Sequence, residues 1–404
     1  MRYINGSFSI ENVKATILAK RFGTPIYCYS YKKLKDNISN FMRSFHSFKP
    51  LISFAVKSNT NVKLLSEIRK LGCGADVVSV GELMKALKAG INPKKIVFSG
   101  VGKTNKEISY AIDKKILLIN AESRSEINEI IKIAKLKKKI VDIGIRLNPN
   151  TDAKTLSQIS TGKKENKFGV TEKSFLQLID FVKKSKYLKL KCLSVHIGSQ
   201  ILSHRPYEKM LTVIDKIIKK SNHHFDYIDL GGGMGIPYLD KMKKLNYQKY
   251  NLAINRFLKN HKSKIIFEPG RSIVGNTGVL ISEITYIKET KGKNFIILDA
   301  AMNDLMRPAL YGAQHKIIPV LKSSKKEKKT YEFVGPICES TDKFLTQKNY
   351  QKLKEKDLVL ICDVGAYGMS LSSNYNVRPK PIEILIKGTK INIIKKRQQL
   401  IDLI

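Results

Sequence analysis

Between residues 50 and 270 the sequence alternates between short β-rich runs and helical stretches, and this alternation constrains the fold more than any other feature. The runs that predict strands are Leu51–Val56, Ala75–Val80, Lys95–Ser99, Ile116–Asn120, Val141–Leu147, Lys191–His196, Phe225–Leu230 and Lys264–Phe267. Helical segments separate them, such as Val62–Leu71, in which apolar residues recur at helical spacing. Strands that alternate with helices predict a parallel sheet. Eight such units fit a closed (β/α)8 barrel of the TIM type better than an open doubly wound sheet.

After residue 278 the pattern changes to strand-like runs without regular helices between them. These runs are Val279–Lys288, Asn294–Asp299, Thr330–Val334, Leu358–Asp363 and Ile382–Lys387. Another strand is predicted at Pro25–Ser30, ahead of the barrel, and it could pair with the C-terminal strands. A chain of 404 residues is also long for one domain. We therefore expect a barrel domain over residues 31–278 and a mainly β domain formed by residues 1–30 and 279–404.

The formal net charge of +40 raises nucleic acids or anionic membranes as partners. The lysines are spread along the whole chain without interleaved aromatic residues, so we expect a lysine-rich surface and no specific nucleic-acid partner. Apolar stretches stay shorter than the ~18 residues of a membrane helix, and the first residues do not read as a signal peptide. We expect a cytoplasmic protein without membrane association. Five cysteines without a CxxC motif argue against a disulfide framework or a metal site.

The active site of a (β/α)8 barrel lies at the carboxyl ends of its strands, and there the sequence places a coherent set of residues. Lys57 follows the first strand, Asp76 lies in the second, and His196 ends the sixth, shortly before Ser199. The loops after strands seven and eight carry Gly231–Gly233 and Glu268–Arg271. Barrels often bind phosphate at these two loops, and consecutive glycines let backbone amides approach an anion. A tight turn explains either loop alone, but the pair favours a phosphate site.

A phosphate-bearing cofactor beside a lysine at a strand end predicts pyridoxal phosphate (PLP). A desolvated lysine amine can form an imine with the cofactor aldehyde, and its position singles out Lys57 among many lysines. His196 could lie flat on the pyridine ring, and Glu268 could hydrogen-bond the pyridine nitrogen, which makes the ring an electron sink. Two Gly-flanked loops near the C-terminus, residues 335–342 and 363–369, are further functional candidates. In the first of them, Cys338 could deliver a proton.

Taken together, these motifs resemble the fold-type III PLP-dependent decarboxylases, and among them the diaminopimelate decarboxylase family. The resemblance covers nearly the whole chain, and it is specific because many pieces occur in the same order. The stretches that carry it are Phe54–Asn59, Gly74–Glu82, Arg146–Pro149, Ser160–Gly162, Lys167–Gly169, His196–Gln200, Gly231–Gly233, Glu268–Arg271, Met302–Tyr311, Gly335–Asp342, Asp363–Asn376 and Arg378–Pro379.

The resemblance implies an alanine racemase-like barrel with a β domain, and decarboxylation of meso-2,6-diaminopimelate to L-lysine and CO2, the last step of lysine biosynthesis. Lys57 would be the Schiff-base lysine, His196 would stack on the cofactor ring, and Glu268 would hold the pyridine nitrogen. The other cofactor-binding residues would be Asp76, Ser199, Gly232, Gly233, Gly270, Arg271 and Tyr367. The substrate-binding residues would be Arg271, Arg307, Tyr311, Glu339 and Tyr367. Cys338 and Glu339 would reach the active site from the other subunit of a homodimer.

The chemistry of the substrate points the same way. meso-Diaminopimelate carries a distal carboxylate, which needs a cation such as Arg307, and a distal ammonium, which needs an anion such as Glu339. The proton that replaces CO2 would come from Cys338 on the resemblance, or otherwise from Lys57. The alternatives are a decarboxylase of the same fold acting on ornithine, arginine or carboxynorspermidine, a non-catalytic regulator, a barrel-only PLP carrier, and a nucleic-acid-binding protein. The presence of Lys57 and Cys338 disfavours the regulator, and the β domain disfavours the carrier.

Overall fold

The computed structural model describes residues 1–153, 161–163, 165–323 and 327–404, and its contacts divide the chain into two compact units. The barrel unit comprises Ile38–Ile236 and Lys243–Ser272. The β unit comprises Met1–Asn37, Pro237–Met242 and Ile273–Ile404. Ser160, which belongs to one of the stretches that carry the family resemblance, lies outside the described residues.

Eight parallel strands close the barrel unit in the order β5-β6-β7-β8-β9-β10-β11-β12 and back to β5. Their bounds are β5 Leu51–Ala55, β6 Gly74–Val77, β7 Ile96–Phe98, β8 Leu118–Ala121, β9 Val141–Leu147, β10 Leu188–Val195, β11 Tyr227–Asp229 and β12 Lys264–Phe267. Ile266 pairs with Leu51 where the last strand meets the first. The predicted barrel is confirmed, and each of the predicted runs overlaps one observed strand.

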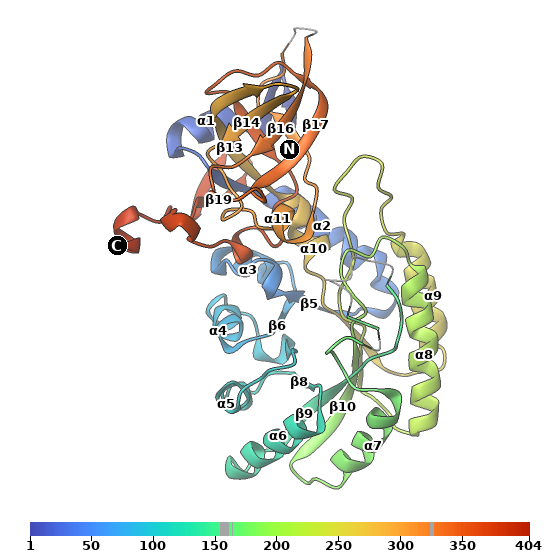
Figure 1. Ribbon diagram of the computed structural model, residues 1–404. Helices are drawn as coiled ribbons and strands as arrows, with labels where there is room; N and C mark the ends of the chain where they lie inside the picture. Colours follow the sequence, from blue (N-terminus) through green and yellow to red (C-terminus); the bar gives the residue numbers. More distant parts are fainter. Residues whose placement is uncertain (154–160, 164, 324–326) are drawn as a thin grey trace. The chain divides into compact units, whose positions relative to one another are not determined.

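Helices follow the barrel strands and form its outer layer (Figure 1). Their bounds are α3 Val62–Lys70, α4 Val80–Lys88, α5 Asn105–Asp113, α6 Arg124–Leu136, α7 Glu172–Lys183, α8 Arg205–Ser221 and α9 Tyr247–Leu258, with α2 Tyr31–Ser44 before the first strand and the short α10 Arg271–Val274 after the last. Local chemistry sets several of their starts. At α5 the Thr104 hydroxyl accepts the Glu107 N–H and the Glu107 carboxylate accepts the Thr104 N–H, a capping box.

The β unit contains a nine-stranded sheet. Its main path runs β17-β16-β14-β13-β4-β19-β20, and β18 pairs with both β13 and β15. The strand bounds are β4 Ile26–Ser30, β13 Gly278–Thr290, β14 Lys293–Leu298, β15 Ile317–Pro319, β16 Lys328–Val334, β17 Lys343–Gln351, β18 Leu358–Ile361, β19 Ile382–Lys387 and β20 Lys390–Lys395. A three-stranded sheet of β1 Arg2–Ile4, β2 Ser7–Ile10 and β3 Val13–Lys14 precedes helix α1 Ala15–Phe22, and α11 spans Arg307–Tyr311.

Strand β4 joins the beginning of the chain to its end. It pairs antiparallel with β13, where Tyr29 faces Gly278, and parallel with β19, where Ile26 faces Ile382. Every residue of β4 is buried, so the strand lies inside the sheet rather than at an edge. The prediction that the N-terminal segment belongs to the C-terminal sheet is confirmed.

Candidate active site

Lys57 and Asp76 meet because two parallel strands are paired in register. Ala55, the last residue of β5, faces Asp76 in β6, and Lys57 lies in the 3-10 turn Val56–Ser58 that follows. The Lys57 amine donates to Asp76 Oδ2 at 2.5 Å. The Asp76 side chain is fully buried, whereas that of Lys57 is 37% exposed. The turn therefore holds the amine at the mouth of the barrel with a buried carboxylate beside it.

A pair of carboxyl groups, those of Asp229 and Glu268, lies at the ends of β11 and β12. Burial, followed by the nearby Asp229 and Asp76 carboxylates, raises the pKa of Glu268 well above its usual value. Burial also raises the pKa of Asp229 to about 6, although the Gly231 N–H donates to its Oδ1 at 2.9 Å. The two carboxyl groups share a hydrogen bond, and Ser99 Oγ donates to Glu268 Oε1 at 3.2 Å. Burial and the neighbouring carboxylates therefore favour the protonated form of Glu268.

His196 is the first residue after β10, and its ring is neutral. The backbone N–H of Gly232 donates to His196 Nδ1 at 3.1 Å, so Nδ1 accepts and the ring proton sits on Nε2. Burial, together with the positive charges of Arg146 and Lys57, lowers the pKa of His196 well below its usual value. The imidazole therefore offers a flat, uncharged face among charged neighbours.

The glycine-rich loops pack so closely that side chains would not fit. A Cβ on Gly232 would lie 2.1 Å from the Glu268 carbonyl oxygen, and one on Gly233 would lie 2.3 Å from the Gly198 carbonyl oxygen. A Cβ on Gly270 would lie 2.9 Å from Ser58. The Gly232 N–H is engaged by His196, so this glycine contributes through its missing side chain more than through its amide.

Arg271 lies at the start of α10 and lines the same end of the barrel. Its Nη2 donates to Ser199 Oγ at 3.0 Å, which links the loop after β10 to the loop after β12. Arg271 is 6% exposed and so is largely removed from solvent. A buried cation beside a hydroxyl and a glycine-rich backbone is an environment that suits a phosphate.

Five of the predicted site residues belong to the β unit. Arg307 begins α11 and Tyr311 ends it. Tyr367 has φ +58°, in the left-handed region. Cys338 is exposed, and its backbone N–H donates to Asn376 Oδ1 at 3.5 Å. Beside it, Glu339 Oε1 accepts the Tyr375 hydroxyl at 2.5 Å.

Asp342 organises the loop that carries Cys338 and Glu339. Its carboxylate accepts the backbone N–H of Met302 at 2.7 Å and that of Ile337 at 2.8 Å. Gly335 permits this arrangement, because a Cβ there would lie 2.3 Å from the same carboxylate. The loop is therefore tied to the segment that leads into α11.

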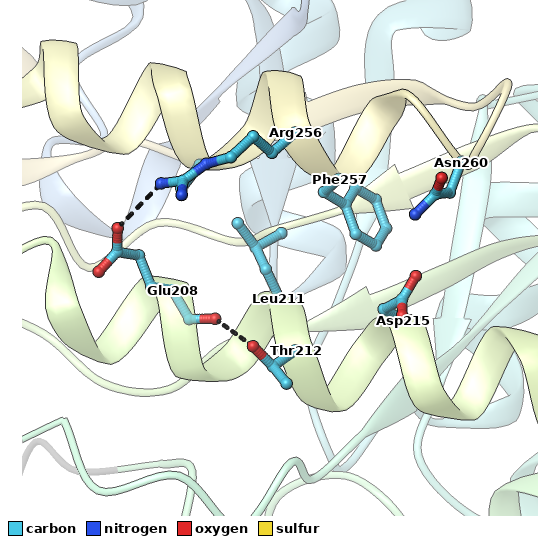
Figure 2. A pocket seen from close by; sticks show the side chains of 8 residues that line it. Glu208, Leu211, Thr212, Asp215, Arg256, Phe257 and Asn260 are labelled. Carbon is cyan, nitrogen blue, oxygen red and sulfur yellow. Dashed lines mark hydrogen bonds and ion pairs between the residues drawn. The ribbon is translucent and has the colours of Figure 1, made fainter.

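A groove lies between α8 and α9 on the outer layer of the barrel unit, and none of the predicted site residues lines it. Figure 2 shows Arg256 of α9 reaching across to Glu208 of α8, at 3.5 Å. The groove lies between helices rather than at strand ends, where barrels place their chemistry. Within the part of the chain that the structure describes, no cluster of His, Cys, Asp or Glu could hold a metal ion. Nor does that part include a helix with the length and apolarity needed to cross a membrane.

Comparison with known proteins identifies the relatives of this arrangement. Residues 31–275 match the family model described as the pyridoxal-binding domain of pyridoxal-dependent decarboxylases. The diaminopimelate decarboxylase of Aquifex aeolicus is 40% identical, covering 98% of this chain and 95% of its own length. That of Helicobacter pylori strain J99 is 43% identical, covering 96% of each chain. The crystal structure of the Helicobacter pylori enzyme in complex with L-lysine superposes with a TM-score of 0.92 at 42% identity, covering 96% of this chain and 98% of that one. The chain belongs to the diaminopimelate decarboxylase family.

Membership of the diaminopimelate decarboxylase family confirms the predicted enzyme class and the predicted cofactor, PLP. The barrel unit fits that cofactor on three observations. The Lys57 amine stands at a strand end. The glycine-rich loops leave no space for a Cβ. Asp76 Oδ1 is buried in the barrel mouth without a hydrogen-bond partner among the described residues. Because buried polar atoms normally have a partner, this oxygen could accept a hydrogen bond from a bound cofactor.

Several polar residues support the site without having been assigned a role from the sequence. Asn120 Nδ2 donates to Asp229 Oδ2 at 3.0 Å and to Ser99 Oγ at 3.3 Å, and Ser194 Oγ donates to the same Asp229 oxygen at 3.3 Å. Asp229 itself ends β11 and hydrogen-bonds Glu268. The available signal was a polar residue near the carboxyl end of an otherwise apolar strand, a position that a (β/α)8 enzyme of this family uses for its chemistry.

Proposed function

We propose that this chain catalyses the decarboxylation of meso-2,6-diaminopimelate to L-lysine and CO2, the last step of lysine biosynthesis. The observation that carries the proposal is the Lys57 amine held by buried Asp76 at the mouth of a closed barrel. It occurs in a chain about 40% identical over its length to diaminopimelate decarboxylases. The related Helicobacter pylori structure is a complex with L-lysine, which is the product that this reaction would release.

We propose that the barrel residues hold and tune the cofactor. Lys57 is the attachment point, and Asp76 sets the position of its amine. His196 supplies a neutral face for ring stacking, and Glu268 hydrogen-bonds the pyridine nitrogen and keeps that nitrogen protonated. Bound PLP supplies an electron sink for the pair left at Cα when CO2 departs. The phosphate is held by Ser199, Gly232, Gly233, Gly270, Arg271 and Tyr367.

We propose that residues of the β unit select the substrate by its distal end. Arg307 binds the distal carboxylate and Glu339 binds the distal ammonium, while Arg271, Tyr311 and Tyr367 complete the binding. Ornithine has no distal carboxylate, so it would leave the buried Arg307 without that partner. The resulting desolvation cost is the physical basis of selectivity.

Decarboxylation requires one proton at Cα for each CO2 that leaves. We propose that the Cys338 thiol delivers this proton, with the Lys57 amine as the alternative donor. We also propose a cytoplasmic homodimer in which Cys338 and Glu339 of one subunit serve the active site of the other. The cofactor-binding domain would extend over residues 31–278, with residues 1–30 and 279–404 as the second domain.

A substrate panel tests the proposed function directly. Purified PLP-loaded enzyme should release CO2 and form lysine from meso-diaminopimelate, with little turnover of ornithine, arginine or carboxynorspermidine. Turnover of ornithine without turnover of meso-diaminopimelate would overturn the substrate assignment and favour the other decarboxylases of this fold.

A further inference from the structure

Three side chains of the β unit form a compact group, which we call the Arg307 clamp: Tyr238, Arg307 and His315. Arg307 Nη1 lies 2.6 Å from His315 Nε2, and the guanidinium carbon lies 4.6 Å from the centre of the Tyr238 ring. The rings of Tyr238 and His315 meet edge to face with centres 5.0 Å apart. Arg307 is 5% exposed and His315 1% exposed. His315 thus contacts one edge of the guanidinium, and the Tyr238 ring covers one of its faces.

The local sequence brings His315 back onto Arg307. Helix α11 begins at Arg307 and ends at Tyr311. The next residue, Gly312, has φ +61°, and its N–H donates to the Pro308 carbonyl at 2.9 Å. This left-handed glycine reverses the chain toward β15. Strand β15 then pairs with β18, and this pairing places His315 Nδ1 2.8 Å from the Cys362 carbonyl oxygen.

Two hydrogen bonds of the His315 ring fix its protonation state. A carbonyl oxygen only accepts, so Nδ1 carries the proton; a guanidinium only donates, so Nε2 must accept. A doubly protonated ring would lose the bond to Arg307 and place two cations in contact. His315 therefore serves Arg307 as a neutral acceptor held in one tautomer by the Cys362 carbonyl.

We propose that His315 is a positioning residue that orients the Arg307 guanidinium toward the distal carboxylate of the substrate. The proposal rests on the role of Arg307 in the proposed function. An arginine side chain has many rotamers, and ordering it on binding weakens the complex. A short bond at 2.6 Å and a covering aromatic ring hold the fork in one orientation before the substrate arrives.

Amide substitutions separate the two bonds of His315. In His315→Gln the side-chain oxygen can reach the position of Nε2 and accept from Arg307, whereas in His315→Asn the shorter amide can replace only the bond to Cys362. We expect His315→Asn to raise KM for meso-diaminopimelate by roughly 10-fold to 100-fold, the usual range for losing a hydrogen bond to a charged group. We expect kcat and PLP affinity to change little, and His315→Gln to stay near the wild type. His315→Met matches Gln in shape but lacks its amide, so its KM should resemble that of His315→Asn. If the Asn variant fails to fold, comparison of the Met and Gln variants still tests the bond to Arg307.

A double-mutant cycle with Arg307→Ala shows whether His315 acts through Arg307. We expect Arg307→Ala to raise KM strongly and His315→Asn to add almost nothing in that background. If Arg307→Ala raises KM while His315→Asn and His315→Met do not, or if the effects are fully additive, the positioning role is wrong and the proposed function stands. If Arg307→Ala leaves KM unchanged, the assigned role of Arg307 is wrong and the inference about His315 falls with it.

Discussion

Gly232→Ala tests whether the close approach of the loops after β11 and β12 shapes the cofactor site. The backbone at Gly232 lies outside the left-handed region, so the added methyl group meets only steric resistance. Its Cβ would lie 2.1 Å from the Glu268 carbonyl oxygen, whereas ordinary contacts begin at 3.4 Å, so the two loops must separate by more than 1 Å. Overpacking of this kind costs about 1–3 kcal/mol. Because the obstacle is backbone rather than a flexible side chain, we expect the upper part of that range.

The separation should also weaken PLP binding, since the Gly232 N–H bonds His196 and the residue pushed away is Glu268. Thermal unfolding with and without PLP measures the first effect, at roughly 2–4 °C per kcal/mol for a domain of this size. Titration with PLP measures the second. Gly102→Ala is the matched control, because its Cβ would meet nothing within 4 Å. If Gly232→Ala and Gly102→Ala had the same Tm and the same PLP affinity, the steric reasoning would be refuted.

Three further predictions address the site and the fold. Lys57→Ala should lose covalent PLP attachment, seen by mass spectrometry after borohydride reduction; an adduct retained at wild-type level would contradict the assignment of Lys57. If active sites are shared between subunits, mixing inactive Lys57→Ala and Cys338→Ala enzymes should restore about one quarter of wild-type activity, since half of the random dimers would carry one intact site; no recovery would argue against sharing. Burial raises the pKa of Asp304 to about 7, so its protonation stabilises the fold at acid pH and this contribution is lost as pH rises toward 7. Between pH 5 and 7 the free energy of unfolding of the wild type should fall as pH rises, and in Asp304→Asn it should fall less steeply. The two slopes should differ by up to about 1.4 kcal/mol per pH unit, and equal slopes in denaturant titrations would contradict this.

The barrel was predictable because its buried strands are continuous apolar runs and its helices have one apolar face. Val141–Leu147 was predicted with its observed bounds. The predicted strand Ala75–Val80 ran too far, because the Ser79 side chain accepts the Glu82 N–H and starts α4 at Val80. Strand β17 was missed, since only Phe344 and Tyr350 of its nine residues are buried. A mostly polar strand is held in place by its pairing with neighbouring strands, so its sequence shows little of the apolar pattern by which strands are predicted.

The candidate residues of the barrel could be predicted from one rule, that chemistry gathers at strand ends. Their mutual contacts could not. The bond between Glu268 and Asp229 and that between His196 and Gly232 depend on the register of strands far apart in the sequence. His315 gave no signal, because it ends no predicted strand and lies eight residues beyond Arg307, where only the turn at Gly312 brings it back.

The position of β4 has a consequence for synthesis on the ribosome. Ile26 emerges early, but its parallel partner Ile382 is made about 350 residues later, which at roughly 5–20 residues per second is a delay on the order of 20–70 s. The barrel unit, which ends at Ser272, is completed within that interval and can fold while β4 still lacks both of its neighbours. During this delay the apolar strand exposes unpaired backbone N–H and C=O groups, which can bind chaperones or pair with other chains and aggregate. Truncation near the C-terminus should therefore destabilise the first thirty residues as much as the last.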